Sequence, residues 1–226
     1  MDDIVKQLIE KTYLELSQGQ KPQEKSRISK TVNGYIYLVA WSNASLLRVL
    51  NKKFTDSLPK SLYRLKTQSD DATRSVVANI EEGFARQTTS EYINFLGYSR
   101  ASLIEEKGDV QRSLQDGILK SAPGSSLKSL GINLEDWHEA LKKSVISKPD
   151  KGSYRKLEVI KGSFKFLYDP VDSLRAETLT YEIFIELINK TDWNIRKLVE
   201  SLEKKLNADK KFYQVEKMRT FEKFKR

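Results

Sequence analysis

The stretch 75–105, SVVANIEEGFARQTTSEYINFLGYSRASLIE, predicts two helices that meet at a corner. Apolar residues recur at helical spacing in its first half, at Val76, Val77, Ile80 and Phe84. Gly83 and the polar run 86–89 then interrupt this pattern. Either Thr89 or Ser90 is suited to cap the next helix, because its hydroxyl can accept a hydrogen bond from a free backbone N–H. Its apolar side then continues through Tyr92, Phe95, Leu96, Ser99, Leu103, Val110 and Leu114.

Four charged residues of this stretch form a predicted ionic cluster between the two helices. They are Glu82, Arg86, Arg100 and Glu105. A partly buried charge needs a partner, because an unpaired one costs several kcal/mol, and an Arg can bind a carboxylate at two points. One interpretation is a salt-bridge network that fixes helix register or subunit contacts. The other is a contact to RNA or protein through the arginines.

The same stretch resembles the 23S ribosomal RNA intervening-sequence family of four-helix-bundle proteins, which share a fold with the accessory variability determinant proteins of diversity-generating retroelements. The family pattern is Ser-x-Pro-x-Asn-Ile-Ala-Glu-Gly-Phe, an Arg, Glu-Phe/Tyr-x-x-Phe-Leu, then Ala-Arg-Gly-Ser-x-x-Glu. The residues that match it are Ser75, Asn79, Ile80, Glu82, Gly83, Phe84, Arg86, Glu91, Tyr92, Phe95, Leu96, Arg100, Ser102 and Glu105. Val77 replaces the Pro, Glu81 an Ala and Ala101 a Gly. The resemblance covers about residues 35–118 and 173–206.

This resemblance implies a protein without enzymatic activity that associates with itself. Family members of known assembly form pentameric barrels, so a homo-oligomer, and specifically a pentamer, is implied here. The resemblance also implies RNA-linked biology. Two forms of this biology are implied. The protein is the product of an open reading frame inside a ribosomal RNA insert, or it assists a reverse transcriptase of a retroelement.

The expected fold is all-α, an up-down-up-down four-helix bundle with an extra helix at the N-terminus. Residues 1–30 are assigned to this helix, over 2–16, and a polar linker. Residues 31–118 hold the first three bundle helices, and 119–172 are an insert. The last bundle helix lies within 173–206, and 207–226 form a basic tail.

Local signals set the expected helix boundaries. The first bundle helix is predicted over 32–54, with Leu58-Pro59 as the turn that follows, because Pro cannot continue a hydrogen-bonded helix. The second begins near Ser61, and the third runs over 90–116 with Gly117 as its stop signal.

The insert and the last bundle helix carry signals of their own. In the insert, Asn133 is predicted to cap a short helix over 133–141, and residues 153–168 favour helix weakly over strand. The last helix shows a heptad seam at Tyr181, Phe184, Ile188, Thr191, Ile195, Leu198 and Leu202. Trp193 falls off this seam, which makes it a candidate for a subunit contact.

Composition excludes several classes of protein. The chain has 226 residues, 38% apolar and 31% charged, which suits a helical soluble protein. It has no Cys, so disulfides and thiolate chemistry are excluded. No stretch approaches the roughly 20 apolar residues of a membrane span, and the start lacks a secretory signal, so we expect a cytoplasmic protein without a membrane partner.

Catalytic and metal chemistry find little support. A di-iron bundle needs a Glu-x-x-His motif on each of two helices, and the only His of the chain is His138, in the insert. No Gly-rich phosphate loop occurs. We therefore expect no catalytic residues, no metal and no cofactor.

The net charge of +9 lies mostly in the insert, where residues 119–172 carry +3, and near the C-terminus. Residues 203–226 hold nine Lys or Arg and four acidic residues, a net charge of +5, interleaved with aromatic residues. The candidates for nucleic-acid binding are Lys204, Lys205, Lys210, Lys211, Lys217, Arg219, Lys223, Lys225 and Arg226. Basic tails commonly bind RNA or DNA, although a tail of solvated lysines on a pure protein-interaction scaffold explains the same composition.

Overall fold

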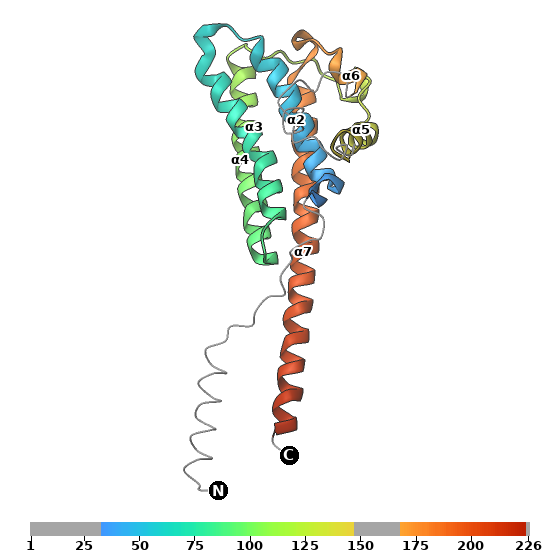
Figure 1. Cartoon of the computed structure of the whole chain (residues 1–226). Helices are drawn as coiled ribbons and strands as arrows, with labels where there is room; N and C mark the ends of the chain where they lie inside the picture. The colour runs from blue at the N-terminus through green and yellow to red at the C-terminus, as the bar shows by residue number, and fades with distance from the viewer. Residues whose placement is uncertain (1–32, 147–167, 225–226) are drawn as a thin grey trace, which may run out of the picture.

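The computed structural model describes residues 33–146 and 168–224, and all regular secondary structure in these ranges is helical. They contain six α-helices and four short 3-10 helices (Figure 1). The elements are η1 (Gly34–Tyr37), α2 (Val39–Asp56), η2 (Lys60–Leu62), α3 (Tyr63–Phe84), α4 (Thr89–Gln115), η3 (Lys128–Leu130), α5 (Leu134–Ile146), α6 (Asp169–Asp172), η4 (Ala176–Thr178) and α7 (Tyr181–Phe224). The helix predicted over 2–16 lies outside the described residues, as does nearly all of that predicted over 153–168.

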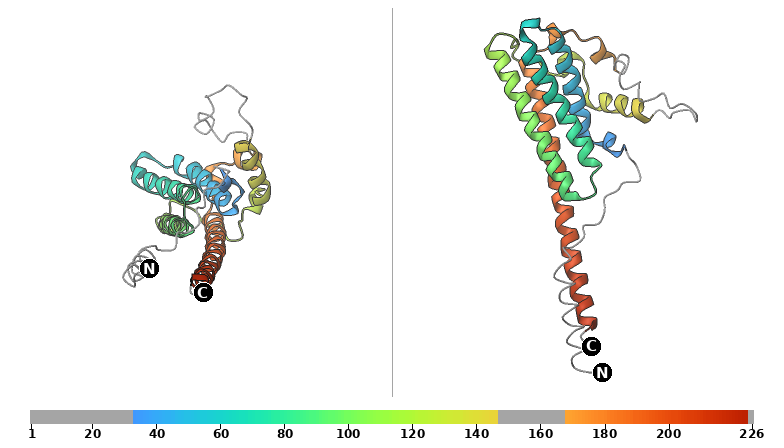
Figure 2. Two further views of the ribbon diagram at one scale, coloured as in Figure 1. Left: turned by 60° about the horizontal axis from the view of Figure 1, so that its bottom comes forward. Right: turned by 60° about the vertical axis from the view of Figure 1, so that its left-hand side comes forward.

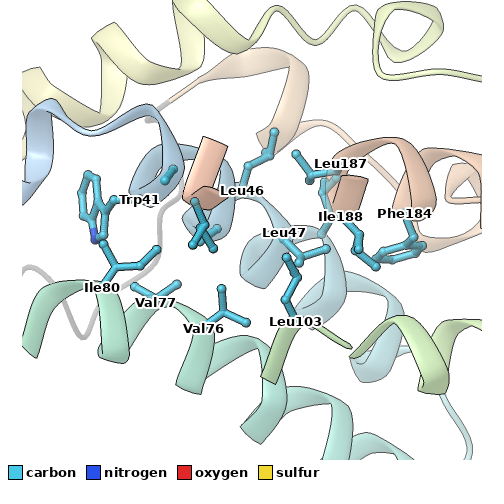
Figure 3. Packing of buried hydrophobic residues seen from close by; sticks show 14 of the residues in the cluster. Trp41, Leu46, Leu47, Val76, Val77, Ile80, Leu103, Phe184, Leu187 and Ile188 are labelled. Atoms are coloured by element: carbon cyan, nitrogen blue, oxygen red, sulfur yellow. The ribbon is translucent and has the colours of Figure 1, made fainter. Parts of the chain in front are cut away.

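The four long helices α2, α3, α4 and α7 pack side by side around one apolar core (Figures 1 and 2). Helix α3 packs against α2 and α4, and α7 packs against α4 and α2. Figure 3 shows the core residues that these helices contribute. Those labelled are Trp41, Leu46, Leu47, Val76, Val77, Ile80, Leu103, Phe184, Leu187 and Ile188. Burial of these side chains drives the packing of the helices, because each removes apolar surface from water.

The first bundle helix begins later than the sequence predicts. A single helix was expected over 32–54, but η1 precedes it and Leu38 has extended backbone angles, φ −87° and ψ 121°. Leu38 N donates to Tyr35 O at 2.9 Å and closes the 3-10 turn. The ring of Tyr35 then packs edge-on against Trp41, so the break brings an aromatic residue onto the end of α2.

The corner between α3 and α4 is capped by Thr88. The prediction of Thr89 or Ser90 was wrong, because both belong to the first turn of α4. Thr88 has extended backbone angles, and its Oγ1 accepts a hydrogen bond from Glu91 N at 3.1 Å. The Glu91 carboxylate accepts in return from Thr88 N at 3.3 Å, which completes a capping box.

Helix α4 ends where Gly117 was predicted to stop it. Gly117 has φ +69°, in the left-handed region that favours glycine. The N–H groups of Ile118 and Leu119 both donate to Ser113 O, so the free carbonyl at the end of the helix is satisfied.

The described parts of the insert are attached to α2. Asn133 Oδ1 accepts from Glu135 N at 2.8 Å, so it caps α5 as expected. Trp137 of α5 is fully buried, and its Nε1 donates to Ser42 O at 2.9 Å. Lys53 Nζ donates to Asp172 O and Leu174 O, which holds the end of α6 against α2. These segments therefore extend the core on one side of α2.

Helix α7 has 44 residues and continues through the boundary at 206/207 that the sequence suggested for a separate tail. It begins beside the end of α4, where Tyr181 N donates to Lys120 O at 3.0 Å. The heptad seam is confirmed as its packed side, since Phe184, Ile188, Thr191, Ile195 and Leu202 are buried. No helix in the part of the chain that the structure describes is long and apolar enough to cross a membrane.

Candidate functional site

The C-terminal half of α7 extends beyond the bundle as a single helix (Figure 1). Leu202 is its last buried residue, and every side chain described between positions 207 and 218 is exposed. At a rise of 1.5 Å per residue, the helix continues for about 33 Å from Leu202 to Phe224. We call residues 203–224 the α7 extension.

The α7 extension presents basic side chains to solvent. Lys204, Lys205, Lys210 and Lys211 are all exposed. Lys217, Arg219 and Lys223 belong to the same helix, whereas Lys225 and Arg226 lie outside the described residues. Ammonium groups distributed around an exposed helix suit a phosphate backbone, which carries charge at regular intervals and is bound chiefly by Lys and Arg.

Apolar side chains share the α7 extension with these lysines. The exposed fractions are 54% for Phe212, 42% for Val215 and 63% for Met218. Ala208 precedes them, and spacings of four, three and three place the four residues on one side of a helix. Most helical stability in proteins comes from the packing of an apolar side, so the exposed apolar side suits a contact with another chain segment or molecule.

The predicted ionic cluster is divided between two places. Arg86 Nη2 lies 4.0 Å from Glu82 Oε2, one turn apart at the end of α3, and both side chains are exposed. The Arg86 guanidinium also lies over the Phe95 ring, 4.2 Å from its centroid. Glu105 is exposed on α4.

Arg100 pairs with a carboxylate outside the predicted cluster. Its Nε donates to Asp192 Oδ1 of α7 at 2.8 Å. Arg196 Nε donates to the other oxygen, Asp192 Oδ2, at 2.9 Å. The physical reason is that Arg100 lies on the side of α4 that faces α7, so Asp192, which the sequence analysis did not single out, is its nearest partner.

A layer of buried polar side chains crosses the interior between α2, α3 and α4. Ser69 Oγ lies 2.7 Å from Asn51 Oδ1 and 2.9 Å from Glu106 Oε2. Asn51 Nδ2 donates to Asp70 Oδ1 at 3.2 Å, and Thr55 Oγ1 donates to the same oxygen at 2.6 Å. Successive hydrogen bonds in this layer join side chains of different helices. The layer therefore fixes the position of each helix along the axis of its neighbours.

Burial shifts the titration of Glu106 in this layer. The Ser69 hydroxyl has one hydrogen and lies within hydrogen-bonding distance of both Asn51 Oδ1 and Glu106 Oε2. Burial raises the pKa of Glu106 to about 8; the hydrogen bond from Ser69 acts in the opposite direction, and the nearby carboxylates of Asp109 and Asp70 raise the pKa. This pKa favours the neutral carboxyl at pH 7.

Two oxygens of this region lack a hydrogen-bond partner, Glu106 Oε1 and Asp109 Oδ2. The other oxygen of Asp109 accepts from Arg112 Nη2 at 2.5 Å. Within the ranges 33–146 and 168–224, no three His, Cys, Asp or Glu side chains gather closely enough to hold a metal ion.

The comparisons with known proteins concern the first three long helices. Residues 37–136 match the model of the 23S rRNA-intervening sequence protein family. This match supports the assignment to that family. It covers a little under half of the 226 residues, from the end of η1 to the first turn of α5, and does not include α7. No curated protein and no solved structure matches the chain.

Two positions of the family pattern gain a physical explanation from the structure. Glu81, where the family has an Ala, accepts a hydrogen bond from Trp41 Nε1 at 2.7 Å and joins α3 to α2. Burial raises the pKa of Glu81, although the bond from Trp41 acts in the opposite direction. Gly83 lets α3 and α4 approach closely, since a Cβ there would lie 2.7 Å from Phe95 Cβ.

Proposed function

We propose that the chain is a non-enzymatic accessory protein that binds RNA or DNA through the α7 extension. In this proposal α2, α3, α4 and α7 form an up-down-up-down four-helix bundle of the 23S rRNA-intervening sequence type. The bundle serves as a rigid base, and the α7 extension is the surface that meets phosphate.

One observation supports this proposal above the others. Residues 203–226 hold nine Lys or Arg against four acidic residues, and seven of these basic residues lie with the four acidic ones on the part of α7 that leaves the bundle. Several lysines and arginines of the bundle form ion pairs with a nearby carboxylate, as Lys66 does with Asp56 and Asp70. The lysines at 204, 205, 210 and 211 are exposed on a helix that projects into solvent.

The proposal includes self-association and a role beside a reverse transcriptase. A homo-oligomer, by resemblance a pentamer, would bring several α7 extensions onto one assembly. Several weak phosphate contacts then act together, because after the first extension binds, the others bind at high effective concentration. The substrate of the partner enzyme would be the same RNA.

The test is a binding titration with a variant in which Lys204, Lys205, Lys210 and Lys211 are replaced by Gln. A labelled single-stranded RNA of arbitrary sequence is titrated with each protein over a series of salt concentrations. If each lysine contacts one phosphate, the slope of log K against log salt becomes shallower by about 3, at roughly 0.7 per contact for a single strand.

A matched control removes four exposed charges from the bundle. Lys60, Arg64, Lys120 and Lys128 lie in or beside the turns at the far end from the extension, and each is exposed. Their replacement by Gln should leave the slope unchanged. Equal loss of binding in both variants would show that binding follows net charge and not the α7 extension.

The alternative is a protein-interaction scaffold without a nucleic-acid partner. It is favoured by three exposed large residues on the bundle, Tyr98 and Ile104 of α4 and Trp193 of α7. These are more suited to a protein contact than to phosphate. Absence of any RNA or DNA binding at low salt would favour this scaffold.

A further inference from the structure

The apolar side of the α7 extension needs an occupant that also tolerates its positive charge. Phe212, Val215 and Met218 are exposed along it, and Lys204 and Lys211 are exposed on the same helix. An apolar partner with negative charge at its edges is therefore the complement of this surface.

Residues 2–16 of the same chain have this character. Ile4, Val5, Leu8, Ile9 and Leu16 recur at helical spacing. The segment carries Asp2, Asp3, Glu10 and Glu15 against Lys6 and Lys11, so its net charge is −2, where residues 203–226 have +5. It is the one stretch of the chain outside the described ranges that pairs a helical apolar pattern with an excess of acidic residues.

The start of the described chain and the start of the α7 extension lie at the same end of the bundle. Helix α7 starts beside the C-terminal end of α4 and runs toward the end where α3 finishes. The first described element, η1, lies at that same end, since Gly34 contacts the ring of Phe84, the last residue of α3. The chain therefore enters the bundle where the α7 extension leaves it (Figure 1).

The intervening chain is long enough to span the extension. Residues 17–32 number 16 and reach at most about 55 Å when fully extended, at about 3.3–3.6 Å per residue. The α7 extension is about 33 Å long at 1.5 Å per residue. Residues 2–16 can thus lie along any part of it without disturbing the bundle.

We propose that residues 2–16 dock as an amphipathic helix on the Ala208–Phe212–Val215–Met218 side of the α7 extension of the same chain. The apolar residues of the segment cover those of the extension, and its acidic residues lie near the lysines. This pairing converts a single exposed helix into a two-helix unit, in which the exposed parts of the apolar side are buried.

The docked segment also regulates the surface beside it. Its carboxylates compete with phosphate for the lysines, so docking weakens nucleic-acid binding and high salt weakens both. This consequence rests on the proposed nucleic-acid function, whereas the docking itself does not.

The docking is tested by energy transfer within one chain and without nucleic acid. The chain has no Cys, so Gln7→Cys and Gln214→Cys introduce two unique labelling sites, and Gln214 is exposed. Doubly labelled protein is diluted with a large excess of unlabelled wild-type protein, so that any assembly holds at most one labelled copy. High transfer that persists after dilution is the expected result.

Two sets of full-length variants make the result decisive. Ile4→Asp with Leu8→Asp should lower the transfer efficiency, because charges replace two apolar contacts. Glu10→Lys with Glu15→Lys should lower it in low salt, and Lys204→Glu with Lys211→Glu added should restore it.

Transfer that disappears on dilution would assign the contact to a second copy and overturn the proposal. Transfer that is the same in all variants would also overturn it, because the segment would then not be docked.

A separate titration distinguishes failure of docking from failure of the proposed function. If docking and nucleic-acid binding both occur, Ile4→Asp with Leu8→Asp should bind RNA at least several-fold more tightly than the wild type. Energy transfer without any RNA binding would uphold docking and reject only the nucleic-acid function. Equal RNA affinity of wild type and variant, with docking present, would reject the competition between them.

Discussion

Ser69 of α3 and Glu106 of α4 form a hydrogen bond of 2.9 Å between the serine hydroxyl and the buried carboxyl. Both residues are almost fully buried, and Ser69 Oγ also lies 2.7 Å from Asn51 Oδ1. A neutral Glu106 is compatible with this interior, whereas an ionised one faces the carboxylates of Asp109 and Asp70 without a cation of its own.

The first prediction is that Glu106 makes the protein less stable as pH rises. The folded pKa, about 8, lies above the ordinary value of 4.5, so the folded state binds more protons between these values. The free energy of unfolding therefore decreases as pH rises from about 4.5 to about 8, by at most about 1.4 kcal/mol per pH unit. Above that range the contribution of Glu106 no longer changes with pH.

Glu106→Gln removes this dependence, because an amide can donate to Ser69 Oγ and does not ionise. Urea unfolding of wild type and variant at pH 5 and pH 9 measures the effect. The variant should gain stability relative to the wild type at pH 9. A difference between the two proteins that is the same at both pH values would show that Glu106 does not titrate in this range.

The second prediction concerns the bond between Arg100 and Asp192. The side chains are 39% and 28% exposed, so solvent screens the pair and its contribution is far below that of a buried ion pair. A double-mutant cycle of Arg100→Ala and Asp192→Ala should give a coupling energy of about 0.5–1 kcal/mol. The matching cycle of Arg100→Ala with Glu82→Ala should give about zero, and significant coupling there would contradict the structure.

The third prediction uses two glycines that differ in their surroundings. In Gly83→Ala the new Cβ would lie 2.7 Å from Phe95 Cβ and 2.8 Å from Tyr92 Cδ2, so α3 and α4 must move apart. The expected loss is about 1–3 kcal/mol of unfolding free energy, offset in part by the better helix propensity of Ala.

Gly97→Ala is its control on α4. No heavy atom lies within 4 Å of the added Cβ, so only helix propensity acts and the variant should be more stable by about 0.5–1 kcal/mol. Thermal or urea unfolding of both variants gives the comparison. Destabilisation by Gly97→Ala, or none by Gly83→Ala, would contradict the packing described here.

Periodicity and turn residues were sufficient to predict most of the helices. The heptad seam of α7 and the stop at Gly117 are local patterns, and both occur in the structure. The cap of α4 was misplaced by one residue, because three consecutive hydroxyl residues at 88–90 all satisfy the sequence rule and only the backbone angles of Thr88 select among them.

The partners of charged residues could not be predicted in the same way. Arg100 pairs with Asp192, 92 positions away, which depends on how α4 and α7 pack. Glu106 was detectable in principle, since it occupies the apolar seam of α4 between Leu103 and Val110. A carboxylate at a seam position indicates a buried acid. The residues predicted for the ionic cluster, such as Glu82 and Glu105, are more exposed than Glu106.

Deletion of residues 207–226 shows whether the α7 extension is the part of the protein that binds nucleic acid. Helix α7 retains its buried seam through Leu202 in the shortened protein, so the bundle should still fold. Filter binding of single-stranded RNA is measured for the full-length and shortened proteins at low and high salt. We expect strong binding by the full-length protein at low salt, a steep loss of binding at high salt, and little binding after the deletion. Binding that survives in the shortened protein, or no binding by the full-length protein at low salt, would contradict this expectation.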